Sequence, residues 1–103
     1  MAFVEKRTPH HDLARVQADV ARLGAAAFTK TALDGGRGMG LTSGEMLAVI
    51  AALSRRTFYK SMTTYADHRV WQDVYHAPTP AGKVAYIKIT LRNRTPVIQF
   101  KEK

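Results

Sequence analysis

The strictest pattern in this chain is a period-two alternation over residues 83–92. Apolar side chains stand at Ala85, Ile87, Ile89 and Leu91, and the positions between them include a phenol, an ammonium and a hydroxyl. Successive side chains of a β-strand point to opposite faces of its sheet, so such a strand buries one face and exposes the other. The sequence therefore predicts a sheet that is covered by helices on one face only.

Three further segments are typical of strands. Residues 58–75 contain neither glycine nor proline and divide into two alternating runs joined at residues 66–68. A last run places Ile98 and Phe100 on the inward face. Four consecutive strands joined by short turns favour antiparallel pairing, and helical patterns precede them. The predicted fold class is α+β, with helices packed on one face of a twisted, mainly antiparallel sheet.

The first half of the chain carries helical signals. Thr8 as N-cap and Pro9 at the first helical position predict the start of a helix. Gly24 predicts its end, and residues 25–33 are predicted to form a second, shorter helical piece.

A glycine-rich stretch separates these signals from a third helix. Residues 35–40 lack the Gly-Lys-Ser/Thr of a phosphate-binding loop and a preceding strand, so they are predicted to form a flexible connector. Thr42 as N-cap, with Glu45 three positions on, makes a capping box that predicts the start of the third helix.

The length of 103 residues suits one domain over residues 1–103. There is no cysteine, so a disulfide framework and a cysteine-based metal site are excluded. No apolar run reaches the roughly 20 residues of a spanning helix, and the opening residues do not resemble a signal peptide. A cytoplasmic location is therefore expected.

The charge is unevenly distributed. Sixteen basic and eight acidic residues give a net charge of +8. Residues 1–51 hold six basic and five acidic residues, a net +1, whereas residues 52–103 hold ten and three, a net +7. A positive field over the predicted sheet favours a polyanionic partner such as nucleic acid, although a charge excess also simply maintains solubility.

The sheet face away from the helices is the candidate site. Its predicted members are Lys60, Met62, Gln72, Tyr86, Lys88 and Lys101. The set lacks a carboxylate pair, and the histidines are too scattered to predict a metal site. A ribonuclease needs neither, because the 2′-hydroxyl of RNA can attack the adjacent phosphate with help from a base, an acid and cations. Crowded lysines with lowered pKa values could serve as base or acid.

Each of these residues also has an ordinary structural interpretation, as a solvated lysine, a packing methionine or a surface amide. Two further hypotheses therefore stay open at this point. One is a nucleic-acid-binding regulator without catalysis, and the other is an interaction module whose basic surface docks an acidic protein.

Four segments carry a resemblance to a known family. They are KRTPH at residues 6–10, FYKSMTTYADHRVWQDVY at 58–75, YIKIT at 86–90 and FKEK at 100–103. In these segments the chain resembles the MqsR toxins, the motility and quorum-sensing regulators of type II toxin–antitoxin pairs. The resemblance implies a RelE- and YoeB-like fold and an mRNA endonuclease that prefers GC-containing triplets.

The resemblance also implies site residues and a partner. The activity-linked residues of the family fall on Lys60, Met62, Gln72, Tyr86 and Lys101. We expect Lys60, Gln72, Tyr86 and Lys101 to act in catalysis. We expect Met62, Arg69 and Lys88 to bind the substrate. An MqsA-like antitoxin with its own zinc is expected to neutralise the chain and to make any contact with DNA. No metal or cofactor is expected in the chain itself.

Overall fold

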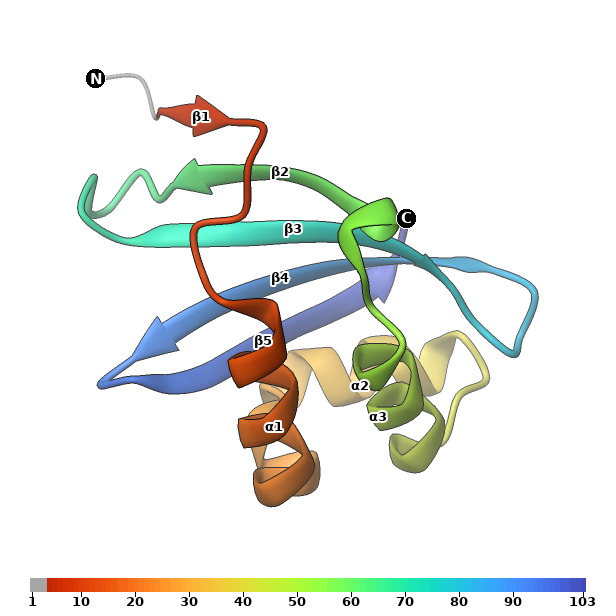
Figure 1. Cartoon of the computed structure of the whole chain (residues 1–103). Coiled ribbons are helices and arrows are strands. Elements are labelled where there is room, and N and C mark those ends of the chain that lie inside the picture. The colour runs from red at the N-terminus through yellow and green to blue at the C-terminus, as the bar shows by residue number, and fades with distance from the viewer. Residues whose placement is uncertain (1–3) are drawn as a thin grey trace.

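The computed structural model describes residues 4–103, which form a five-stranded sheet and three α-helices (Figure 1). In chain order the elements are β1 (Glu5–Lys6), α1 (Leu13–Leu23), the 3₁₀ turn η1 (Gly24–Ala27), α2 (Lys30–Gly38), α3 (Ser43–Ala51), the 3₁₀ turn η2 (Arg55–Thr57), β2 (Phe58–Thr63), β3 (Trp71–Pro78), β4 (Val84–Arg92) and β5 (Thr95–Glu102). The strands lie side by side in sequence order, and each neighbouring pair is antiparallel. The predicted α+β class is confirmed, with β1 as an additional edge strand.

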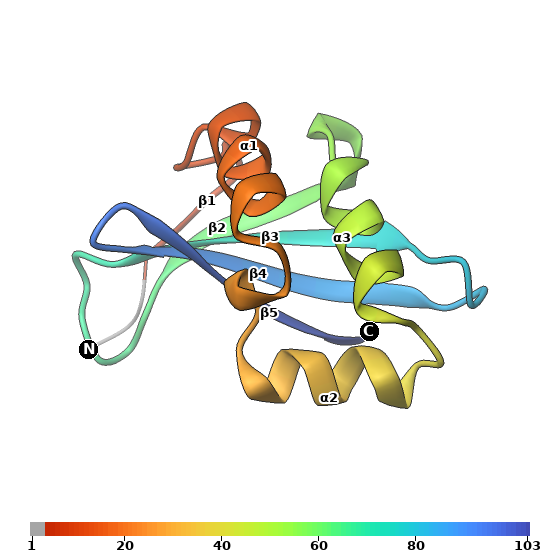
Figure 2. The same cartoon turned by 90° about the horizontal axis from the view of Figure 1, so that it is seen from below.

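The alternating residues of β4 and β5 form the centre of the core. Ala85, Ile87 and Ile89 are almost completely buried, as are Ile98 and Phe100 opposite them on β5. Burying each large aliphatic side chain stabilises the fold by roughly 1.5–3 kcal/mol. Helices α1 and α3 cover this face of the sheet, while α2 runs along β5 at its edge (Figure 2). We call the opposite surface of the sheet the open face.

The first helix starts later than the sequence predicted. Its N-cap is Asp12, whose side chain accepts a hydrogen bond from the backbone N–H of Arg15, so the start predicted at Thr8 and Pro9 is wrong. The reason lies in β3. The backbone N–H groups of residues 10 and 11 donate to the buried carboxylate of Asp73, which holds the segment before α1 outside the helix.

The glycine-rich stretch is the largest correction. Residues 35–38 belong to α2, which starts at the N-cap Thr29, so a flexible connector was the wrong prediction there. The helix predicted over residues 25–33 is interrupted at Phe28, which forms a parallel bridge with Ile98. The backbone N–H of Thr29 donates to the carbonyl of Ile98 at 3.1 Å, so this segment covers the free edge of β5.

The third helix starts as the sequence predicted. Thr42 accepts a hydrogen bond from the backbone N–H of Glu45, and the Glu45 carboxylate accepts one from the backbone N–H of Thr42. Met46 and Ile50 of this helix are buried against the core. The chain from α3 through η2 then leads into β2, which carries the first of the candidate site residues.

Candidate active site on the open face

The strand register brings the predicted residues together. Met62 on β2 pairs with Gln72 on β3, and Tyr86 on β4 pairs with Lys101 on β5. One row crosses four strands and consists of Lys60, Val74, Lys88 and Gln99. Side chains of directly paired residues lie on the same face of an antiparallel sheet, and alternate residues of one strand share that face. All six residues predicted for the exposed surface therefore lie on the open face.

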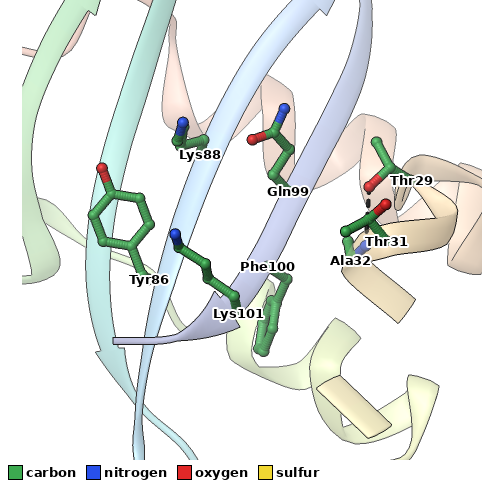
Figure 3. Close-up of a pocket in the computed structure, with 8 residues that line it drawn as sticks. All are labelled: Thr29, Thr31, Ala32, Tyr86, Lys88, Gln99, Phe100 and Lys101. Atoms are coloured by element: carbon green, nitrogen blue, oxygen red, sulfur yellow. Dashed lines mark hydrogen bonds between the residues drawn. The ribbon is translucent and has the colours of Figure 1, made fainter. Parts of the chain in front are cut away.

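A pocket of about 380 Å³ opens where this face meets the start of α2 (Figure 3). We call it the cation pocket; its lining residues are Thr29, Thr31, Ala32, Tyr86, Lys88, Gln99, Phe100 and Lys101. The side chains of Lys88, Lys101 and Tyr86 project from the sheet on the same side, and the threonines face them from α2 (Figure 3). Two ammonium groups and a phenol beside hydroxyl donors are suited to hold a phosphate group.

The lysines differ in their electrostatic surroundings. Burial, followed by the neighbouring charge of Lys101, lowers the pKa of Lys88. The pKa of Lys60 is instead raised, chiefly by a hydrogen bond to the carboxylate of Glu5, whose oxygen lies 2.5 Å from the ammonium. The expectation of lowered lysine pKa values thus holds for Lys88 and is wrong for Lys60. Lys60 is therefore held as a cation, whereas Lys88 gives up its proton more readily than an ordinary lysine.

His76 is a member of the open face that the sequence interpretation missed. It pairs with Tyr86 in the register, and its ring stacks on Tyr59 with centroids 4.3 Å apart. Among the described residues its buried Nε2 has no hydrogen-bond partner. Burial, and secondarily Lys103, lowers the pKa of this imidazole, so it is neutral at pH 7. The alternation of β3 over residues 72, 74 and 76 was the signal that could have placed it here.

The partly buried imidazole of His76 makes the stability of the chain depend on pH. The folded chain binds a proton at His76 less readily than the unfolded chain, so the free energy of unfolding falls as the pH drops through the ordinary histidine range of about 6.5. Thermal melts between about pH 7.5 and 5.5 are expected to show this loss for the wild type and a smaller loss for His76→Gln. Equal losses in both proteins would contradict the assignment. His10, whose pKa is also lowered by burial, contributes to the loss that remains in the variant.

Gln72 and Arg69 lie away from the cation pocket. The Gln72 side chain donates through Nε2 to Thr90 Oγ1 at 3.3 Å, further along the open face. Arg69 stands in the loop between β2 and β3, where its guanidinium pairs with Asp67 at 3.1 Å. The side chain of Arg69 is 91% exposed, so it can reach a bound polyanion only from the rim.

Asp73 was not predicted as a special residue, although it is completely buried. Its carboxylate accepts hydrogen bonds from Ser61 Oγ at 2.6 Å and from the backbone N–H groups of His10 and His11. The ring of His10 also stacks on Trp71, with centroids 5.0 Å apart. These contacts fix the segment between β1 and α1, and β1 in turn positions Glu5 beside Lys60.

Within residues 4–103 no cluster of three or more His, Cys, Asp or Glu side chains is arranged to hold a metal ion. Over the same residues, no helix has the length and apolar character needed to cross a bilayer.

Fold and site together define a small α+β domain whose open sheet face carries cations, phenols and amides around a pocket of about 380 Å³. Residues 8–102 match the family described as the motility quorum-sensing regulator, toxin of MqsA. The chain is also 44% identical over 100 residues to the mRNA interferase toxin MqsR of Escherichia coli strain K12, which covers 97% of this chain and 100% of that protein. The chain belongs to the MqsR toxin family, and the resemblance found in its sequence is confirmed.

Proposed function

We propose that this chain is an mRNA interferase, an endoribonuclease toxin that cleaves messenger RNA in the cytoplasm. The observation that carries the proposal is the convergence of Lys60, Tyr86, Lys88 and Lys101 on one open face, in a chain that is 44% identical to an mRNA interferase toxin over 97% of its length. These four side chains come from three strands, β2, β4 and β5, and lie on the face that the helices leave uncovered (Figure 2). Such a cationic surface with exposed rings suits single-stranded RNA.

The reaction we propose is attack by the ribose 2′-oxygen on the neighbouring phosphorus. A bond forms between the 2′-oxygen and phosphorus, and the bond from phosphorus to the 5′-oxygen breaks. The products are a 2′,3′-cyclic phosphate and a 5′-hydroxyl, so the proton lost from the 2′-hydroxyl is balanced by one gained at the 5′-oxygen. The protein must supply a base, an acid and positive charge for the phosphorane.

Roles for the open-face residues follow from their electrostatics. Lys60, kept protonated by Glu5, and Lys101 stabilise the negative charge that develops on the phosphorane. Lys88, whose pKa is lowered by burial, gives up a proton more readily than an ordinary lysine and is the lysine to which we assign proton exchange. Tyr86 stacks on a splayed base or donates its phenol proton. Gln72 and Met62 bind the RNA strand further along the open face, and Arg69 contacts it at the rim.

The partner we propose is an MqsA-like antitoxin. The matching family is described as the toxin of MqsA, and a cationic face offers an acidic partner an extended surface. In this proposal contact with DNA comes only through the antitoxin. We further propose that cleavage prefers GC-containing triplets.

The test is cleavage of a defined RNA by the purified chain in excess EDTA. We expect cleavage to persist, with new ends that carry 5′-hydroxyl and 2′,3′-cyclic phosphate groups, because lysines and a phenol supply the chemistry. The matched substrate replaces the 2′-hydroxyl at each cleavage site by hydrogen, and it should remain intact. Cleavage of that deoxy substrate, or loss of activity on chelation, would contradict the mechanism. If the chain instead bound RNA in a salt-sensitive way without producing new ends, it would be an RNA-binding protein and not a nuclease.

A further inference from the structure

A second pocket lies on the open face beside the cation pocket. Its volume is about 550 Å³, and it extends from β3 and β4 toward the loop between β2 and β3. Gln99 lines both pockets, so they are adjoining parts of one surface. We call it the amide pocket; its polar lining includes Asp67, Gln72, Thr90, Arg92, Asn93 and Gln99.

The chemistry of the amide pocket differs from that of the cation pocket. Its lining includes the amides of Gln72 and Gln99 and the hydroxyl of Thr90, which are neutral donors and acceptors. Two charged side chains also belong to the lining, that of Arg92 and that of Asp67, whose carboxylate is already paired with Arg69. Side-chain amides can read the edges of nucleobases, whereas most contacts of lysine and arginine to nucleic acid are made with phosphate.

Apolar side chains complete the lining. Val70 and Val97 contribute to the same pocket. A nucleobase has two apolar faces and an edge of donors and acceptors, so it needs this combination of surfaces. The hydrogen bond from Gln72 Nε2 to Thr90 Oγ1 fixes the orientation of the Gln72 amide before a ligand arrives.

The strand geometry sets the distance between the pockets. The row with Lys88 and Gln99 is followed by the row with Thr90 and Val97, two residues further along each strand. Two residues of a strand span roughly 6.7 Å. A nucleotide whose phosphate lies against Lys88 can therefore place a base beside Gln99 and Thr90 without crossing the sheet.

We propose that the amide pocket binds an unstacked nucleobase next to the scissile linkage, and that Gln99 and Thr90 determine which base is accepted. This inference rests on the proposed function, because it assigns a subsite to the same reaction. It makes base preference a property of β4 and β5, separate from the cations that act on the phosphate.

The test couples a change in the RNA to a change in the protein. Short RNAs with one cleavage site are prepared with each neighbouring base intact or replaced by an abasic ribose. For the wild type, one abasic position is expected to lower kcat/KM about ten- to a hundredfold. In Gln99→Leu, which keeps the volume and loses the amide, that penalty should shrink at the same position, and the preference among the four bases should flatten. Thr90→Val is the second variant, with the same expected direction.

The control is Thr95→Ala, an exposed polar position on the same strand and face that lines neither pocket. It should keep the wild-type abasic penalty. Equal abasic penalties in the wild type, Gln99→Leu and Thr90→Val would overturn the proposal that the amide pocket binds a base. They would leave the proposed nuclease activity unaffected. Absence of cleavage of every RNA by the wild type would instead overturn the proposed function. Thermal melts of all variants verify that each is folded.

Discussion

Replacement of Lys60 by alanine is expected to lower the rate of RNA cleavage about 10²–10³-fold, with little change in stability. Its ammonium stays protonated at neutral pH because the carboxylate of Glu5 raises its pKa. A fixed cation beside the reacting phosphate stabilises charge that develops only in the transition state, so its removal lowers kcat more than it raises KM. Single-turnover cleavage at saturating protein measures this directly.

The stability of Lys60→Ala should change much less than its cleavage rate. The Lys60 and Glu5 side chains are 18% and 35% exposed, and partly exposed ion pairs contribute at most about 1 kcal/mol. Lys83→Ala is the matched control, because Lys83 also pairs with a carboxylate, that of Glu102 at 3.5 Å, but lies in the turn before β4, outside the row that holds Lys60 and Lys88. It removes the same charge and should leave cleavage near the wild-type rate. Similar rate losses in both variants would indicate a general effect of net charge, and a large fall in melting temperature for Lys60→Ala would indicate a structural role.

The face that carries Lys60 could be predicted because strand parity is a local property. Alternation within each strand was enough to group Lys60, Gln72, Tyr86 and Lys101, and the register then confirmed that they share a surface. The pairing of Lys60 with Glu5 joins residues far apart in the chain, and no local pattern indicates which strand lies at the edge. Because that partner was missing, the direction of the Lys60 pKa shift was predicted wrongly.

The buried Asp73 was missed for a related reason. In the sequence it is one polar residue in an alternating strand, which is typical of an exposed position. Its donors come from Ser61 on the neighbouring strand and from the backbone of residues 10 and 11. A buried carboxylate is stable only where such donors surround it, and they become visible only when the chain has folded.

The glycine-rich stretch shows that one composition is compatible with two structures, a flexible connector and a closely packed helix. Four glycines in six residues are typical of a flexible connector, and that was the prediction. In the structure, Gly36 is buried against Met46, and Gly35 lies against the backbone of β5. Glycine permits this close approach because it has no Cβ. Sequence alone does not distinguish a glycine that makes the backbone flexible from one that allows another segment to pack closely against it.

Gly35→Ala tests that interpretation and should strongly destabilise the chain. A Cβ at this position would lie 2.3 Å from the carbonyl oxygen of Phe100, a backbone atom that cannot rotate away. Either α2 or β5 must therefore shift, at a cost of about 3 kcal/mol. In a domain of this size that corresponds to a melting temperature roughly 10–20 °C lower.

Gly38→Ala is the control within the same helix, because its Cβ would meet nothing within 4 Å. It should leave stability unchanged or raise it by up to about 1 kcal/mol, since alanine favours the helix. If both variants lost stability equally, the glycines would act through backbone freedom and not through contact. The contact also bears on the site, because α2 supplies Thr29 and Thr31 to the cation pocket. Any Gly35→Ala protein that remains folded should therefore bind RNA more weakly than Gly38→Ala, whose helix keeps its place against β5.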